Sequence, residues 1–173
     1  MSSAAEGAPG KFPRWLPAYV GVGSNLSDPR AQVARAFDAL ARLPRSQLLA
    51  RSPLYQTPPF GDVAQPPFVN AAAGLLTQLS PEEMLAALRD VEKSLGREPP
   101  VERWGPRLID LDLLVQGSEK RNTEILKLPH PGIAERDFVL YPLADIAPDL
   151  DVPGVGRVVR LRGAVANRGV EKL

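Results

Sequence analysis

The sequence contains no cysteine and a single histidine, His130, and both shortages restrict its chemistry. Without cysteine there can be no disulfide bond and no thiolate metal site. One histidine excludes a zinc site built from several imidazoles. A metal site in this chain must therefore use oxygen ligands, which favours magnesium.

A strong net charge, a long apolar run and a phosphate-binding glycine motif are also missing. Lys and Arg number 21 against 20 Asp and Glu, so bulk attraction to nucleic acid or to a membrane surface is not indicated. No apolar run reaches the roughly 20 residues of a membrane span. The pattern G-x-x-x-x-G-K-[ST] is absent, which excludes phosphate binding of the P-loop type.

The amino-terminal residues differ in composition from the rest of the chain. Residues 1–17 mix Ser, Ala, Gly and Pro and lack the apolar segment of a secretory signal. We expect them to form a flexible leader, and residues 18–173 to form one domain of a cytoplasmic protein.

Two aspartates, Asp110 and Asp112, interrupt an apolar run at residues 109–115. Successive side chains of a strand point to opposite faces, so this pair shares one face and the apolar residues fill the other. Carboxylates placed in this way can bind one divalent cation or bridge two, as in phosphoryl-transfer sites. The alternative is a solvated edge face.

The segment before this strand, residues 97–107, carries three arginines, one tryptophan, three prolines and one glycine. Its composition predicts a loop, and unstructured loops of this length are often lids. Its arginines can supply positive charge to phosphates. They favour the metal-site interpretation of the aspartate pair over the solvated face.

Hydrophobic periodicity and turn signals divide the remaining chain into strands and helices. Ser27 or Asp28 is expected to cap the first helix, and Ser80 opens a capping box for the second. The predicted strands cover residues 18–23, 46–56, 68–77, 109–115 and 136–141, and the predicted helices residues 29–43 and 81–95. This order predicts an α+β sandwich of the ferredoxin-like type, a mostly antiparallel sheet with helices covering one face. The basic tail beyond Asp149 is expected to be solvated.

Two features of the predicted strands bear on ligand binding. Phe68 and Asn70 lie on one face of the third strand, and a buried carboxamide is costly unless its donor and acceptor are used. An amide beside an aromatic ring suits a flat, hydrogen-bonding heterocycle, although Phe68 taken alone is better explained as a core residue. Gly21 and Gly23 could let the backbone approach a nucleotide, but G-x-G alone is a weak signal, and close packing of a helix on the sheet is the favoured explanation.

Taken together, these segments resemble the 6-hydroxymethyl-7,8-dihydropterin pyrophosphokinase family over about residues 18–150. The run from Arg103 to Asp112 is the most specific part. The segments that carry the resemblance are Val22-Gly23-Ser24-Asn25-Leu26, Tyr55-Gln56-Thr57-Pro58-Pro59, Phe68-Val69-Asn70-Ala71-Ala72, Glu92 with Gly96-Arg97, Glu102-Arg103-Trp104-Gly105-Pro106-Arg107, Asp110-Leu111-Asp112, and Leu128-Pro129-His130 with Arg136 and Phe138.

The resemblance implies transfer of pyrophosphate from ATP to the hydroxymethyl group of a reduced pterin, with release of AMP, in folate biosynthesis. It implies two Mg²⁺ ions held by Asp110 and Asp112, and catalytic roles for these residues together with Arg97 and Arg107. The implied ATP contacts are Glu92, Arg97, Arg107, Leu113, His130 and Arg136. The implied pterin contacts are Thr57, Pro58, Phe60, Phe68, Asn70, Trp104 and Phe138. We expect a monomer that binds neither nucleic acid nor membrane.

The chain departs from the family pattern after Arg97, where Glu98-Pro99-Pro100 replaces further basic residues, and at Pro131, where an aromatic residue is common. Two other functions are considered. A non-catalytic pterin- or nucleotide-binding module would gain little from two neighbouring carboxylates. An RNA-binding ferredoxin-like domain would need a basic face with exposed aromatic residues, which the balanced charge disfavours.

Overall fold

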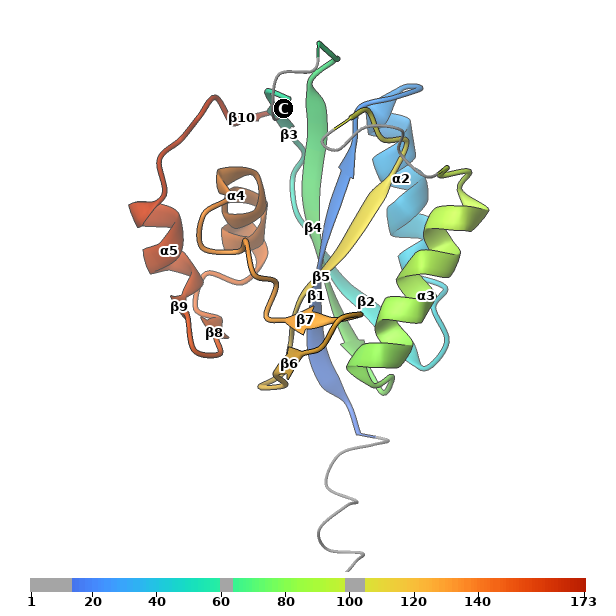
Figure 1. The fold of residues 1–173 in the computed structure, drawn as a ribbon, viewed down its shortest axis with the longest axis vertical. Coiled ribbons are helices and arrows are strands. Elements are labelled where there is room, and N and C mark those ends of the chain that lie inside the picture. The colour runs from blue at the N-terminus through green and yellow to red at the C-terminus, as the bar shows by residue number, and fades with distance from the viewer. Residues whose placement is uncertain (1–13, 60–63, 99–104) are drawn as a thin grey trace, which may run out of the picture.

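The computed structural model describes residues 14–59, 64–98 and 105–173 (Figure 1). The first part of the chain forms the main strands and two long helices. They are β1 (Leu16–Ser24), α2 (Pro29–Leu40), β2 (Ser46–Arg51), β3 (Tyr55–Thr57), β4 (Phe68–Thr77), α3 (Pro81–Ser94) and β5 (Asp110–Gln116). Shorter elements follow: β6 (Arg121–Asn122), β7 (Lys127–Leu128), α4 (Asp137–Ile146), β8 (Asp151–Val152), β9 (Gly156–Arg157), α5 (Val158–Ala164) and β10 (Glu171–Lys172).

The central sheet has the strand order β10-β3-β4-β1-β5, and β2 pairs with β4 beside β3. All of its pairings are antiparallel. The unit from β1 to β5 is a strand–helix–strand followed by a second one, and β1 and β4 lie at the centre. This arrangement confirms the predicted α+β, ferredoxin-like fold.

Helices lie on both faces of this sheet, whereas the sequence predicted one covered face (Figure 1). Helices α2 and α3 bury one apolar cluster against the sheet, with Val33, Phe37 and Leu88 at its centre. Helix α4, followed by α5, buries a second cluster on the opposite face, around Leu140 and Leu143. The second layer was missed because α4 was not recognised as a helix.

The segment 136–141 was predicted as a strand, but Arg136 is the N-cap of α4 and residues 137–141 form the first half of that helix. The local sequence disfavours a helix, because Pro142 follows directly and a proline inside an apolar segment usually ends a helix. Here Pro142 lies within the helix. Residues Val139, Leu140 and Leu143 recur at helical spacing and are buried against the sheet, so tertiary packing overrides the local signal.

The other predicted elements are found with shifted ends. Strand β1 begins at Leu16, two residues before the expected domain start, and the predicted strand 46–56 is divided into β2 and β3. The tail beyond Asp149 is not merely solvated, because it forms α5 and pairs β10 with β3. Residues 1–13 lie outside the described residues, so the leader stays a prediction.

The predicted caps of both long helices are present. Asp28 accepts a hydrogen bond from Ala31 at the start of α2. At the start of α3, Ser80 Oγ accepts from the Glu83 N–H at 3.1 Å, and Glu83 Oε1 accepts from the Ser80 N–H at 2.9 Å. This reciprocal pair fixes where α3 begins, and therefore which side chains of its last turns reach the sheet. No helix in the described ranges is long and apolar enough to span a membrane.

Candidate active site

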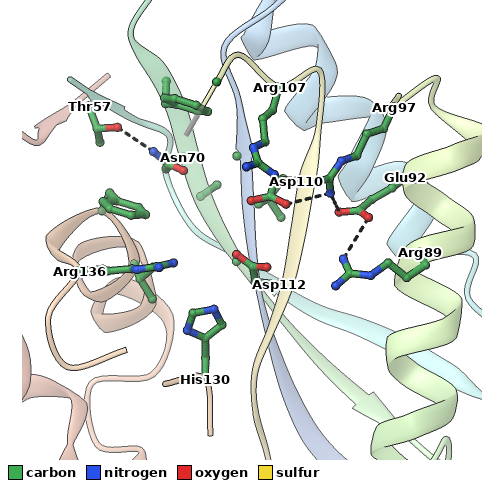
Figure 2. A pocket seen from close by; sticks show the side chains of 18 of the residues that line it. Thr57, Asn70, Arg89, Glu92, Arg97, Arg107, Asp110, Asp112, His130 and Arg136 are labelled. Atoms are coloured by element: carbon green, nitrogen blue, oxygen red, sulfur yellow. Dashed lines mark hydrogen bonds and ion pairs between the residues drawn. The ribbon is translucent and has the colours of Figure 1, made fainter. Parts of the chain in front are cut away.

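One end of the sheet collects the predicted site residues. Because the strands are antiparallel, the carboxyl ends of β1 and β3 lie beside the amino ends of β4 and β5. The register places Gly23 opposite both Asp110 and Asn70, and Asn70 opposite Tyr55. A pocket of about 560 Å³ opens at this end, within the range of roughly 300–1,000 Å³ typical of ligand sites (Figure 2).

The aspartate pair points into this pocket from the first and third residues of β5, as the alternation predicts (Figure 2). Burial, and after it the neighbouring Asp110 carboxylate, raise the pKa of Asp112 to about 7, while Arg136 opposes the rise. Two carboxylates thus lie where their charges repel each other. A divalent cation would relieve that repulsion, so the oxygen-donor set fits magnesium.

Glu92, from the last turns of α3, is the centre of a buried ion-pair network beside Asp110. Its Oε2 accepts from Arg97 Nη1 at 2.6 Å and from the Leu111 N–H at 2.7 Å, and its Oε1 accepts from Arg89 Nη1 at 3.1 Å. The same Arg97 Nη1 donates to Asp110 Oδ1 at 3.0 Å. Glu92 is only 3% exposed. It therefore ties α3 to β5 and aims the Arg97 guanidinium at the pocket.

His130 and Arg136 line the opposite side of the aspartate pair (Figure 2). Burial and the nearby Arg136 charge lower the pKa of His130 to about 4, so the imidazole is neutral near pH 7. Its Nδ1 accepts a hydrogen bond from the Gly132 N–H at 3.1 Å. The proton is therefore on Nε2, which makes His130 a neutral hydrogen-bond donor on its other side.

A second group of side chains lies over the β3–β4 edge of the pocket. Asn70 Nδ2 donates to Thr57 Oγ1 at 2.8 Å within the buried part of the sheet. Phe68 and Phe138 are half-buried and line the same region. An amide and a hydroxyl in the same pocket as two aromatic rings suit a flat heterocycle with a polar edge.

Gly21 and Gly23 form part of the pocket floor, and this corrects the expectation that they serve helix packing. A Cβ atom on Gly23 would lie 2.7 Å from Asn70 Oδ1. Gly23 is therefore required by the position of the Asn70 amide on the neighbouring strand. Sequence periodicity could not reveal this, because the contact joins residues 47 positions apart.

Asn25, which is 2% exposed, joins the two loops that border the pocket. Its Oδ1 accepts from the Arg107 N–H at 2.8 Å, and its own N–H donates to the Arg107 carbonyl at 3.0 Å. Its Nδ2 donates to Gln65 Oε1 at 2.8 Å and to the Pro66 carbonyl at 3.0 Å. One buried carboxamide thus fixes the end of each loop against β1.

The structure brings together every predicted site residue that it describes except one. Leu113 is 4% exposed in the core between the sheet and α2–α3, because it follows Asp112 and so faces the other way. Its side chain does not line the pocket. Phe60 and Trp104 lie outside the described residues, as do the central residues of the predicted lid. Sequence reasoning missed Arg89, whose spacing of three residues from Glu92 was the available signal.

A family model described as 7,8-dihydro-6-hydroxymethylpterin-pyrophosphokinase (HPPK) matches residues 19–148. The chain belongs to this family. Among curated relatives, the 2-amino-4-hydroxy-6-hydroxymethyldihydropteridine pyrophosphokinase of Pseudomonas aeruginosa is 46% identical over 155 residues, 90% of this chain and 95% of the relative. The protein of the same name from Methylorubrum extorquens is 46% identical over 137 residues, 79% of this chain and 86% of the relative.

Solved structures of the family agree with the fold. The chain aligns with the Plasmodium falciparum HPPK-DHPS S436F/A437G/A613T triple mutant with a TM-score of 0.67 at 13% identity, over 87% of this chain. It spans 43% of the length of that protein. The likeness at this identity supports the HPPK fold, and the functional argument comes from the family match and the pocket.

Proposed function

We propose that the chain transfers pyrophosphate from ATP to the hydroxymethyl group of 6-hydroxymethyl-7,8-dihydropterin, and that its pocket residues divide between the two substrates. The pyrophosphokinase activity in folate biosynthesis is that of the family, and the named relatives carry it. The observation that supports the division is the shared pocket, in which charged groups gather on the β5 side and the Asn70 amide lies on the β3–β4 side with two aromatic residues in the lining.

The β5 side is assigned to the ATP phosphates and the metal. Asp110 and Asp112 would hold Mg²⁺, and the pair leaves coordination positions for phosphate oxygens, which is how Mg²⁺ usually binds in such sites. When bound, the metal neutralises phosphate charge and aligns the transferred group. Arg97, Arg107 and Arg136 offer guanidinium donors to the phosphates.

Two further groups on this side are Glu92, which holds a donor in place, and His130, which is itself a donor. Glu92 accepts a hydrogen bond from Arg97, so the Arg97 guanidinium is held in the pocket before a nucleotide binds. Neutral His130 presents its Nε2–H as a hydrogen-bond donor without adding charge. Positioning and charge neutralisation are most of what phosphoryl transfer demands of a protein, and no side chain needs to act as a strong base.

The β3–β4 side is assigned to the pterin. Asn70 and Thr57 lie where they can bond to the polar edge of the ring, with Pro58 beside them, while Phe68 and Phe138 can contact its faces. Phe60 and Trp104 stay predicted pterin contacts, because both lie outside the described residues. The number of metal ions, a monomeric state and a cytoplasmic location likewise stay predictions.

The test is incubation of the protein with ATP, MgCl₂ and 6-hydroxymethyl-7,8-dihydropterin, followed by ³¹P NMR and chromatography of the nucleotides. Pyrophosphate transfer yields AMP and a pterin diphosphate in equal amounts, and omission of the pterin abolishes AMP formation. Asp110→Ala should abolish turnover, whereas Asp38→Asn, on the exposed side of α2, should leave it unchanged. Formation of ADP, or AMP formation that does not depend on the pterin, would contradict the proposal.

A further inference from the structure

Asp137 is a buried carboxylate at the first position of α4, between two proposed substrate contacts, Arg136 and Phe138. It is 6% exposed and does not line the pocket. Its Oδ1 accepts from the Phe138 N–H at 2.8 Å, and its Oδ2 accepts from the Arg168 N–H at 2.6 Å. A buried carboxylate bound by two backbone donors holds those two pieces of backbone together.

The second donor belongs to a segment that returns from α5 to the sheet, residues 167–173, called here the C-terminal segment. Its turn is closed by Asn167, whose Oδ1 accepts from the N–H groups of Gly169 and Val170 at 2.8 Å each. It then pairs with β3 through β10, and the Leu173 N–H donates to the Leu54 carbonyl at 2.9 Å. The segment therefore joins the start of α4 to strand β3.

The C-terminal segment also packs directly behind the proposed pterin contacts of β3. Gly169 has a positive φ of 104°, and a Cβ atom there would lie 2.8 Å from Pro58 Cγ. The β10 pairing places Glu171 opposite Gln56, the residue before Thr57. Both walls of the pterin side, Thr57-Pro58 and Phe138, are thus fastened to one short segment that lies beyond the family match at residues 19–148.

We propose that Asp137 is a positioning residue for the pterin side of the pocket, acting through the C-terminal segment. The carboxylate fixes the backbone of Phe138 relative to β3, so that the aromatic ring stands at a set separation from Asn70 and Thr57. This inference rests on the proposed function. A stacking contact loses strength within a fraction of an ångström of displacement, so a loosened first turn of α4 should weaken pterin binding without removing any group that touches the ligand.

The ATP side has separate supports, which makes the proposal selective. Arg97 is held by Glu92, on the far side of the pocket from α4. The Arg136 side chain packs closely against Gly132, in the turn before α4. A Cβ atom added to Gly132 would lie only 2.6 Å from Arg136 Nε. Loss of the Asp137 carboxylate leaves the Arg97–Glu92 contact and the packing of Arg136 on Gly132 in place, although Arg136 also lies over the Phe138 ring, 5.8 Å from its centroid.

The experiment compares Asp137→Asn and Asp137→Ala with the wild-type protein in steady-state kinetics with each substrate varied in turn. Asn keeps the volume and one acceptor oxygen, but its NH₂ group cannot accept from the second N–H. We expect KM for the pterin to rise about five- to tenfold in the Ala variant and by a smaller factor in the Asn variant, as for loss of one or two hydrogen bonds. KM for ATP should change by less than about twofold.

Asp38→Asn, an exposed carboxylate on α2, is the matched control and should change neither constant. If the Ala variant does not fold, the change in KM for the pterin in the Asn variant tests the proposal. Equal increases in both KM values, or a lower melting temperature with an unchanged KM for the pterin, would show a purely structural role and overturn the proposal. Absence of AMP formation by the wild-type protein would instead count against the proposed function, before any variant is compared.

Discussion

Replacing Asp112 by asparagine should make the ligand-free protein more stable while abolishing its activity. The ionised Asp112 carboxylate lies beside Asp110 in a partly buried position, and both circumstances raise its pKa from 3.8 to about 7. In the unfolded chain the group ionises freely near its ordinary pKa. The folded state therefore bears a cost for every ionised Asp112, and asparagine removes that cost without changing the shape of the side chain.

The magnitude follows from the same shift. A pKa that rises from 3.8 to about 7 corresponds to about 4 kcal/mol, at about 1.4 kcal/mol for each tenfold change in the protonation equilibrium. The carboxyl group is partly exposed, so solvent screening reduces this figure, and we expect about 1–3 kcal/mol. For a chain of this size that is an increase in melting temperature of about 2–10 °C.

The sign predicts a particular pH window. A carboxyl whose pKa is raised on folding contributes stability below its unfolded pKa and loses it as the pH rises through the folded value. The stability difference between Asp112→Asn and wild type should therefore be small near pH 4, grow up to about pH 7, and stay level above it. Asp38→Asn, an exposed aspartate on α2, should show no such growth.

The assay is urea unfolding from pH 4 to pH 8 in EDTA, followed by circular dichroism, with AMP formation measured in parallel. Mg²⁺ should stabilise the wild-type protein more than the variant, because a ligand that binds the folded state stabilises it by mass action. The reasoning is refuted if Asp112→Asn is less stable than wild type at pH 8, or if the difference does not depend on pH.

The other predictions concern three further groups of the pocket. Glu92→Ala should lower the free energy of unfolding by about 2–4 kcal/mol, because it leaves a buried N–H and a guanidinium without their acceptor, and Glu92→Gln by less; a loss below about 1 kcal/mol for the Ala variant in urea unfolding would contradict the network. Gly23→Ala should displace the Asn70 amide and raise KM for the pterin more than for ATP, whereas Gly163→Ala, whose added methyl meets nothing within 4 Å, should leave both unchanged; equal effects of the two substitutions would argue against the contact. His130 should titrate in NMR with a pKa of about 4 in the ligand-free protein, and since it is the single histidine its signal is unambiguous; a pKa above 6 would mean that the imidazole is not held neutral by burial.

The local features of this chain could be predicted from its sequence because they depend on neighbouring residues. Strand alternation placed Asp110 and Asp112 together on a ligand-facing side. Proline and capping residues located the start of α3 at Pro81, and the apolar run located β4 at Phe68–Thr77. The resemblance indicated the family and most of the residues that line the pocket.

Where the sequence pattern and the tertiary packing favour different structures, only the tertiary structure shows which one forms. Residues 136–141 have an apolar pattern that suits a strand, but burial of Leu140 and Leu143 against the second face of the sheet makes them part of α4. Leu113 was expected to contact ATP from the resemblance alone, although strand alternation places it on the face opposite Asp112, and it is buried in the core. Its direction is set by the pleat of β5, which turns it toward α2 and α3.

The sequence by itself determined the main strands and the two long helices of this protein, and the chemical types of its site residues. The sequence alone was enough to recognise oxygen ligands, arginines and an amide beside aromatic residues. The tertiary structure decided which groups meet: Gly23 beneath Asn70, Asn25 between two loops, and Asp137 against the backbone of Arg168. These contacts join residues 31 to 82 positions apart, and no local propensity encodes a distance that only the pairing of strands and the packing of helices on the sheet create.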